Sequence, residues 1–157
     1  MRRGYRIVAA TVLLPLSVLV VGCAPSPGSS TVNVTLQEWS VLVDDDSVPA
    51  GEVTFAVANE GPGDVHEFVV IRTLPAGVPV DVDAGALPAD ATGAVDEASS
   101  ELEVIDEIED IAVGDTQELT VTLEPGNYVL VCNIYTEDEQ EAHYAMGMRS
   151  AFTVEGE

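Results

Sequence analysis

The sequence predicts an all-β protein, a Greek-key β-sandwich, and two observations carry this prediction. Short runs rich in β-branched residues alternate between apolar and polar positions, as half-buried strands do. Glycine, proline and asparagine residues separate these runs at short intervals, which is typical of an antiparallel sandwich. We therefore expect one sandwich domain over residues 31–157, and the chain shows no internal repeat.

Six segments are the clearest candidate strands. Residues 31–39 alternate, with Val32, Val34 and Leu36 on one face. Residues 67–72 are almost continuously apolar, as in a strand that is buried on both faces. The remaining strands are expected at 51–59, 119–123, 128–134 and 151–154.

The segment between residues 75 and 110 follows no such simple pattern. Its first part, 75–100, is rich in Ala, Gly, Asp and Pro, and it is predicted to form a long surface excursion. Isoleucine or leucine then recurs at every third position, at Leu102, Ile105, Ile108 and Ile111. This spacing suits either a short amphipathic helix or an irregular segment at the edge of a sheet.

The first 22 residues have the layout of a secretory leader. Three arginines precede an apolar run over 7–21, which ends at Gly22-Cys23. The run is shorter than the roughly 20 residues that a membrane-spanning helix needs. A cysteine directly after a small residue resembles the lipobox of bacterial lipoproteins, which implies acylation of Cys23, a flexible tether over 23–30 and a location on the outer face of the cell membrane. An ordinary cleaved signal and an uncleaved anchor are the alternatives.

The charge of the chain excludes some classes of partner. All 28 acidic residues follow Cys23, and Arg72 and Arg149 are the only strong bases in that part. Such a chain is not expected to bind nucleic acid, because binding depends on cations that meet phosphates. Anionic lipid would also repel it, so an anchor would have to hold it at a membrane. Two explanations of the acidity are open. The charge provides solubility or salt adaptation, or it forms a docking surface for a basic redox partner.

The cysteines and histidines point to a metal site. If Cys23 carries lipid, Cys132 has no disulfide partner and is an inert thiol, a reactive thiol or a metal ligand. The two histidines of the chain, His66 and His143, supply two imidazoles. Imidazole and thiolate suit copper, because copper(II) heads the affinity order of the divalent metals and thiolate holds copper(I). A trigonal His-Cys-His site with a weak axial methionine is a geometry for electron transfer.

The motifs around these residues resemble the cupredoxin family, especially its plastocyanin- and rusticyanin-like members. An early loop with Asn59-Glu60-Gly61 precedes one histidine, and Tyr128 stands four residues before the cysteine. The resemblance spans about residues 31–154. It implies one type 1 copper ion with a ligand set of His66, Cys132, His143 and Met148. Met146 is the alternative to Met148 at the axial position.

One departure from the family pattern affects the second histidine. Ten residues, 133–142, separate Cys132 from His143, whereas cupredoxins have only a few. The segment is predicted to be an acidic insertion that keeps both ends of the loop, since the cost of closing a loop grows slowly with its length. It could loosen the site, expose it to water or misplace His143. Acidic side chains near the metal, Glu67 among them, would favour copper(II) and lower the reduction potential.

The expected function is one-electron transfer between unidentified donor and acceptor proteins at the membrane, without enzymatic turnover. The sequence shows no Ser-His-Asp set, no phosphate-binding glycine loop and no second metal cluster. Two alternatives remain: a copper carrier or storage protein with a more open site, and a non-redox interaction module of the same fold. The absorption spectrum of the copper-loaded protein distinguishes them.

Overall fold

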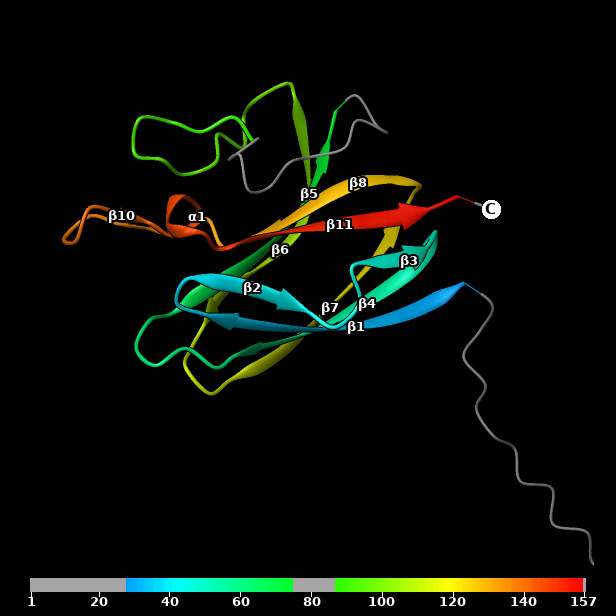
Figure 1. The fold of residues 1–157 in the computed structure, drawn as a ribbon, viewed down its shortest axis with the longest axis horizontal. Coiled ribbons are helices and arrows are strands. Elements are labelled where there is room, and N and C mark those ends of the chain that lie inside the picture. Colours follow the sequence, from blue (N-terminus) through cyan, green and yellow to red (C-terminus); the bar gives the residue numbers. More distant parts are fainter. Residues whose placement is uncertain (1–27, 75–86, 157) are drawn as a thin grey trace, which may run out of the picture.

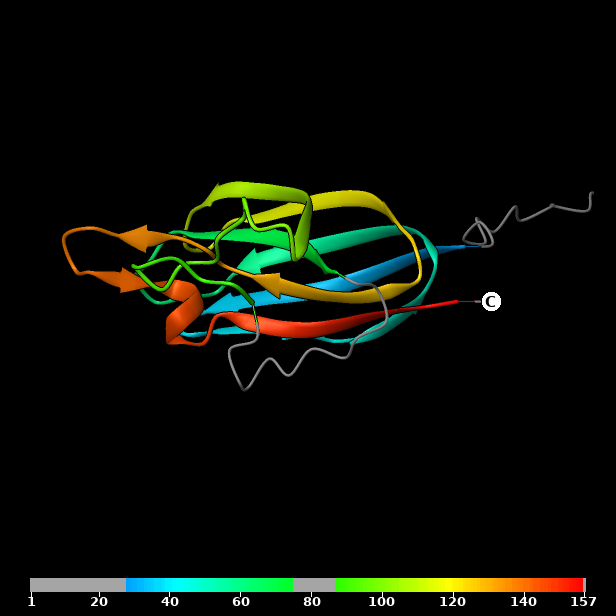
Figure 2. The ribbon, with the colours of Figure 1, turned by 90° about the horizontal axis from the view of Figure 1, so that it is seen from above.

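The computed structural model describes residues 28–74 and 87–156, which are almost entirely β. The elements are β1 (Ser29–Gln37), β2 (Ser40–Val43), β3 (Ser47–Pro49), β4 (Gly51–Asn59), β5 (His66–Thr73), β6 (Leu102–Ile111), β7 (Thr116–Leu123), β8 (Gly126–Val131), β9 (Tyr135–Thr136), β10 (Glu141–Ala142), α1 (His143–Met146) and β11 (Arg149–Glu155). Two sheets, in the orders β2-β1-β4-β7 and β3-β11-β8-β5-β6, make the sandwich (Figure 1). The β9–β10 ribbon and α1 extend from one end, and the C-terminus lies at the other (Figure 2).

The main core lies between the two sheets and follows the predicted alternation. Val32, Val34 and Leu36 of β1 are at most 1 % exposed, as the alternating pattern requires. Phe55 of β4 packs against Phe68 of β5 and against Phe152 of β11, with ring centroids 5.3 and 5.4 Å apart. These aromatic contacts join the inner faces of the two sheets, so the predicted sandwich is confirmed.

Strand pairing differs from a purely antiparallel sandwich at two places. β1 pairs with β4 in parallel, and β3 pairs with β11 in parallel. The chain leaves β1 through the β1–β2 hairpin, crosses to the other sheet as β3 and returns as β4. This crossover provides the length that two parallel neighbours need, which a tight turn cannot supply. The alternation of side chains reports only which face is buried, so it predicted the strands without their directions.

The five-stranded sheet is covered on its outer face as well. Val69 and Ile71 of β5 and Val129 and Val131 of β8 are fully buried on that side. Leu87 and Val95 belong to residues 87–101, which lie over these strands and which we call the cover segment. The prediction of a strand buried on both faces is therefore confirmed for β5. The rest of the predicted excursion, 75–86, lies outside the described residues.

Residues 102–111 form the edge strand β6, and the alternative of a helix is wrong. β6 pairs with β5 in an antiparallel ladder that contains two register shifts. Each shift adds one residue to β6 and changes which side chains face the core. For this reason Ile105, Ile108 and Ile111 all pack against the main core although they stand three residues apart.

The amino-terminal region lies outside the described residues. The predicted leader, the predicted acylation site Cys23 and most of the predicted tether fall in residues 1–27. The first strand, β1, begins at Ser29, two residues before the start that the alternation predicted. No helix within the described ranges is long and apolar enough to cross a membrane.

Tyr128 closes the turn before β8. Its hydroxyl donates a 2.8 Å hydrogen bond to the backbone oxygen of Glu124, the tyrosine corner expected of a sandwich. We expect Tyr128→Phe to lower the free energy of unfolding by about 0.5–1.5 kcal/mol, the usual net value of one such bond. Urea unfolding should show a lower midpoint with an unchanged slope. Tyr135→Phe is the control, and an equal loss in both variants would contradict the role of the corner.

Candidate metal centre

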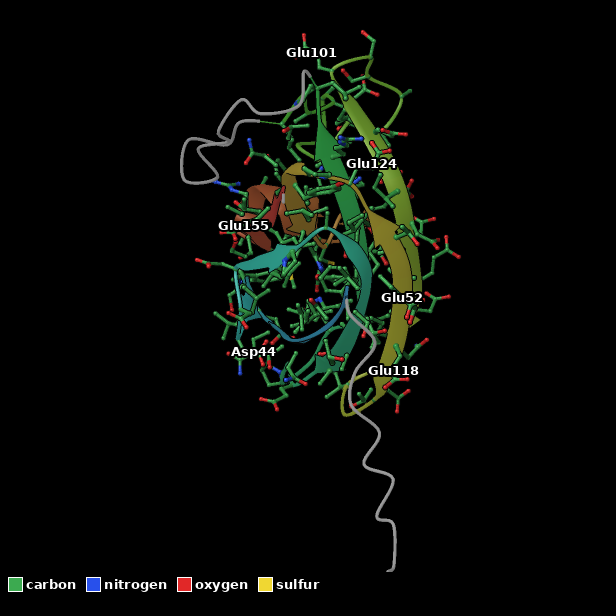
Figure 3. The ribbon with its side chains drawn as sticks, turned by 90° about the vertical axis from the view of Figure 1, so that its right-hand side faces the viewer. Asp44, Glu52, Glu101, Glu118, Glu124 and Glu155 are labelled. Carbon is green, nitrogen blue, oxygen red and sulfur yellow. The ribbon has the colours of Figure 1, made fainter. Side chains whose placement is uncertain are left out.

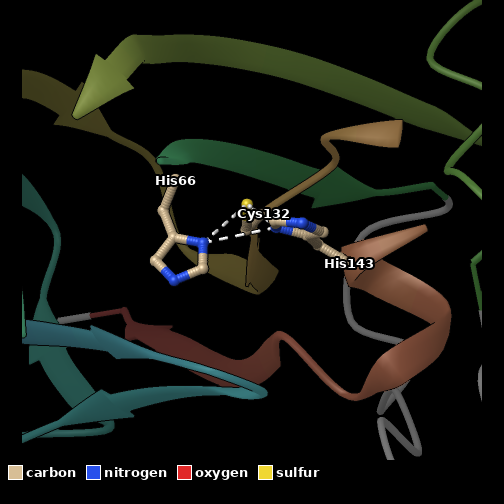
Figure 4. A group of neighbouring side chains, drawn as sticks. All are labelled: His66, Cys132 and His143. Atoms are coloured by element: carbon tan, nitrogen blue, oxygen red, sulfur yellow. Dashed lines mark hydrogen bonds between the residues drawn. The ribbon is translucent and has the colours of Figure 1, made fainter. Parts of the chain in front are cut away.

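Three possible metal ligands meet at one end of the sandwich. His66 begins β5, Cys132 directly follows β8, and His143 begins α1. Figure 4 shows the three side chains converging from these elements. Sγ of Cys132 lies 3.8 Å from Nδ1 of His66 and 3.4 Å from Nδ1 of His143, and the two nitrogens are 3.3 Å apart. Residues that are far apart in the sequence therefore supply one compact donor set.

These distances fit a three-coordinate metal ion. Nitrogen and sulfur donors about 2.0–2.3 Å from one ion, spread about 120° apart, would lie about 3.5–3.8 Å from one another. The observed separations of 3.3–3.8 Å match that triangle closely. His66 and Cys132 are 0 % exposed and His143 is 2 % exposed, so water has little access. The donor types and their arrangement fit a type 1 copper site.

The ten residues between Cys132 and His143 do not displace the histidine. β9 and β10 pair with each other, with Tyr135 opposite Ala142 and Thr136 opposite Glu141. The N–H of His143 donates to the backbone oxygen of Ile134 at 2.9 Å, which closes the base of this ribbon. The additional residues therefore project away as a hairpin, and its two ends return to the metal centre together.

Of the two methionines near the end of this loop, Met148 is the one associated with the cluster. Met148 is fully buried in the same core cluster as Cys132, whereas Met146 is 44 % exposed. The backbone oxygen of Met148 accepts a hydrogen bond from the N–H of Cys132 at 3.1 Å. The N–H of Met148 donates to the backbone oxygen of His143 at 3.0 Å. These contacts favour Met148 over Met146 as the neighbour of the donor set.

A buried asparagine holds the loop that precedes His66. Nδ2 of Asn59 donates to the backbone oxygens of Ile111 and Asp64 at 2.8 and 2.9 Å. Its Oδ1 accepts from the N–H of Gly61 at 2.9 Å. Asn59 is 1 % exposed, so breaking these bonds would leave buried polar groups unpaired. The Asn59-Glu60-Gly61 motif thus orders the loop backbone that positions His66.

Sequence reasoning missed Glu38, which lies in the turn between β1 and β2. Its Oε1 accepts from the N–H groups of Gly63 and Asp64 at 3.0 and 2.8 Å. Burial opposes ionisation of this carboxyl group, but the two N–H groups and the nearby His66 outweigh it, so its pKa lies below the usual value. No local pattern marks Glu38, because its partners lie in a loop distant in the sequence.

The neighbouring Trp39 has a second role besides core packing. Trp39 is partly buried and packs against the main core. Its ring also meets the ring of His143 edge to face, with centroids 5.2 Å apart and an interplanar angle of 74°. The β1–β2 turn therefore contacts both histidines, through Glu38 and Trp39.

Burial sets the protonation states of the three donors. It raises the pKa of the Cys132 thiol to about 11, against the opposing effect of the Glu67 N–H, which lies 3.4 Å from Sγ. Burial also lowers the pKa of both imidazoles below 6.5, and His143 lowers that of His66 further. The metal-free protein therefore carries a protonated thiol and neutral imidazoles at pH 7. A metal ion that binds there displaces the thiol proton.

Asn133, directly after Cys132, connects the centre to its surroundings. Its N–H donates to Oε1 of Glu67 at 2.7 Å. Its side chain bonds the backbone N–H and oxygen of Val95 and, at 2.7 Å, Oε1 of Glu97. These bonds tie the end of β8 to β5 and to the cover segment. The position of Asn133 next to the cysteine is the only local signal for this role.

The Glu67 carboxyl group makes the stability of the metal-free protein depend on pH. Burial, together with nearby Glu97 and Glu107, raises its pKa to about 7 from 4.5. The protonated group contributes stability that is present below about pH 4.5 and is lost as pH rises through about 7. Glu67→Gln should therefore raise the free energy of unfolding at pH 8 by about 2–3 kcal/mol, allowing for partial exposure of the side chain.

This expectation for Glu67→Gln is checked by urea unfolding of metal-free protein at pH 8 and pH 5. The gain over the wild type should be largest at pH 8 and should shrink toward pH 4.5. Glu52→Gln, at an exposed position of β4, is the matched control for loss of one negative charge. A gain that does not change with pH would argue against a raised Glu67 pKa.

The fold and this donor set together define the class of the protein: a β-sandwich with the fold of the cupredoxins, whose His-Cys-His cluster fits type 1 copper. The chain is similar to the dithionite-reduced auracyanin of the photosynthetic bacterium Roseiflexus castenholzii, at 24 % identity over 82 % of this chain and 98 % of that one, with a TM-score of 0.53. Auracyanin A from Chloroflexus aurantiacus, described as a "blue" copper protein, shares 20 % identity over 82 % and 100 % of the two chains, with a TM-score of 0.50.

Rusticyanin from Thiobacillus ferrooxidans is a third structure of the same fold. It shares 17 % identity over 83 % of this chain and 79 % of its own, with a TM-score of 0.55. No protein-family profile and no curated protein matches the sequence. The comparisons therefore establish the fold, and the evidence for a metal centre lies in the side chains of the chain itself.

Proposed function

We propose that the protein binds one copper ion at His66, Cys132, His143 and Met148 and transfers single electrons. The observation that carries this proposal is the buried triangle of Nδ1, Nδ1 and Sγ atoms, 3.3–3.8 Å apart. A bound copper ion would supply the redox step by changing between copper(II) and copper(I). Two proteins of the same fold, auracyanin A and rusticyanin, are described as copper proteins, which supports the choice of metal.

The protein's own part in this function is to keep the donors in place in both redox states. His66 is held by β5 and by the loop bonded to Asn59, and Cys132 is held at the end of β8. His143 is held by its N–H bond to Ile134 and by the Trp39 ring. Donors that are fixed and buried rearrange little, which favours rapid electron transfer over exchange of the metal. A carrier or storage protein would be served better by an open site.

The absorption spectrum of the mature protein with one equivalent of copper(II) tests this function. We expect an intense visible band from the thiolate–copper bond and reversible bleaching by a reductant. A protein that binds copper(I) tightly and stays colourless with copper(II) would indicate a carrier or storage role. Absence of tight copper binding would leave a non-redox interaction module.

Met148 is proposed as the weak axial ligand. We expect Met148→Leu, which keeps the volume but removes the thioether, to raise the reduction potential and to shift the visible band, with less than about a 1.5 kcal/mol loss of stability. Met146→Leu, at an exposed position, should leave both unchanged. Cyclic voltammetry and absorption spectra of the two variants check this. Equal effects of both substitutions would contradict the assignment.

We further propose that acylation of Cys23 anchors the protein to the outer face of the cell membrane. The leader pattern and the small residue before Cys23 support this. Expression in a bacterial host should give a membrane-bound form whose mass includes the acyl chains. Cys23→Ala should release the protein from the membrane fraction, and an unchanged distribution would contradict the anchor.

The redox partner is proposed to be basic. The arginines of the described ranges are both engaged: Arg72 pairs with Glu124 at 3.0 Å, and Arg149 donates to the oxygen of Tyr144 at 3.0 Å. Acidic residues from both sheets and from the loops spread over the face shown in Figure 3. Such a surface attracts a cationic partner over a long range. Electron transfer to a basic redox protein should slow steeply with rising salt, and a rate independent of salt would contradict this.

A further inference from the structure

The turn between β1 and β2 places a carboxylate beside the first histidine. Oε1 of Glu38 lies 3.9 Å from Nε2 of His66, on the side of the ring opposite to the metal-facing Nδ1. The Glu38 side chain is only 12 % exposed and that of His66 is 0 % exposed. A buried carboxylate next to a buried imidazole is costly unless the two groups interact.

The position of this carboxylate is strongly constrained. Its Oε1 is held by the N–H groups of Gly63 and Asp64. A Cβ atom on Gly61 would lie 2.7 Å from Oε1 and 3.1 Å from Oε2, so a glycine at this position leaves the room that the carboxylate occupies. The loop before His66 is therefore built around Glu38.

One buried atom of each of these two side chains has no hydrogen-bond partner among the described residues. These atoms are Nε2 of His66 and Oε2 of Glu38. If Nδ1 of His66 is to bind a metal, the ring proton must sit on Nε2, and the nearby carboxylate is a suitable acceptor. A closure of about 1 Å would bring the 3.9 Å separation of Nε2 and Oε1 into hydrogen-bond range.

We propose that Glu38 is a positioning residue for the metal centre: its carboxylate keeps the proton of His66 on Nε2, leaves the Nδ1 lone pair for the metal and, through its negative charge, favours copper(II) over copper(I). The copper part of this inference rests on the proposed function, whereas the tautomer part concerns the metal-free protein. A carboxylate that orients a ligating imidazole also makes it a stronger donor.

The tautomer of His66 in the metal-free protein is the first test. Long-range proton–nitrogen correlation spectra of ¹⁵N-histidine-labelled protein report which ring nitrogen carries the proton. We expect Nε2–H for His66 in the wild type. A proton on Nδ1 in the wild-type protein would overturn the proposal without any variant, so a failure of variants to fold cannot obscure the result.

Glu38→Gln is the second test. A glutamine oxygen in the place of Oε1 can still accept hydrogen bonds from Gly63 and Asp64, but without the negative charge it is a weaker acceptor for a proton on Nε2 of His66, and the NH2 group in the place of Oε2 cannot accept one. We expect the ratio of the two tautomers to change at least about tenfold and copper(II) affinity to fall about 10–100-fold. Copper(I) affinity should fall less, so the reduction potential should rise. An unchanged tautomer ratio or an unchanged ratio of the two affinities would overturn the inference.

Asp64→Asn is the matched control. It removes one negative charge that acts on both histidines, but among the hydrogen bonds of the described residues none joins the Asp64 carboxylate to either histidine. We expect its tautomer ratio to equal that of the wild type and its change in the affinity ratio to be smaller than that of Glu38→Gln. A change as large as that of Glu38→Gln would reduce the role of Glu38 to general charge and overturn the positioning role.

These readouts also separate the inference from the proposed function. If the copper(II) protein lacks the thiolate–copper band while His66 keeps the Nε2–H tautomer, the electron-transfer function fails and the tautomer part stands. If the band is present but Glu38→Gln changes neither the tautomer ratio nor the affinity ratio, the inference fails and the function stands.

Discussion

Cys132→Ser should abolish the intense visible absorption of the copper(II)-loaded protein. A serine hydroxyl stays protonated near pH 7 and is a poor ligand for copper, whereas the thiolate binds both oxidation states. Loss of a group that only orients a ligand costs about 10–100-fold in affinity, so the loss of this direct ligand should cost roughly 100-fold or more. Absorption spectra and a competition titration for copper measure the two effects.

The fold should survive this substitution. Serine is close in size to cysteine. Its hydroxyl can accept a hydrogen bond from the N–H of Glu67, which donates to Sγ of Cys132 in the wild type. Urea unfolding of the metal-free variant checks this. Cys23→Ser changes the other cysteine of the chain and should leave the spectrum of the copper-loaded domain unchanged. A blue protein that survives Cys132→Ser would refute the ligand assignment.

Copper(II) affinity should fall steeply with acid. The Cys132 thiol, with a pKa of about 11, is protonated across the neutral range, so the ion must displace one proton and the affinity should drop about tenfold per pH unit. From pH 8 to pH 5 this effect alone amounts to about a thousandfold loss.

The histidines add to this dependence only at lower pH. Their imidazoles have pKa values lowered from 6.5, mainly by burial, so they are neutral at pH 7 and offer no proton for the ion to displace. Once they protonate, the loss of affinity should steepen toward three protons per ion. Titrations against a chelator of known pH dependence measure the slope. Affinity that stays unchanged well below pH 5 would exclude a site of histidine and cysteine.

The local sequence pattern was sufficient for the parts of the structure that depend on near neighbours. Alternation along β1 and β4 identified the buried face, because side chains of a strand point to opposite faces in turn. Tyr128 and Cys132 stand four residues apart and lie in one core cluster, as a period of two requires. The donor types of His66, Cys132 and His143 indicated a metal site, because only a few metals suit imidazole and thiolate together.

The sequence pattern did not predict the conformation of the loop between Cys132 and His143. The ten residues after Cys132 could have loosened the site, and their composition did not decide the matter. Pairing of β9 with β10 decided it, because this pairing returns His143 to the base of the hairpin. Pairing of two such short strands depends on their contact with the rest of the domain, since isolated hairpins are marginally stable.

The sequence by itself thus determined six of the strands (β1, β4, β5, β7, β8 and β11), the buried face of the alternating ones and the chemical identity of the donors, all of which follow from residue type and a period of two. Only the tertiary structure decided the parallel pairing of β1 with β4, the edge position of β6 and the placement of Glu38 beside His66. Each of these joins residues distant along the chain. Such contacts depend on the register and crossing of whole strands, which no local pattern records.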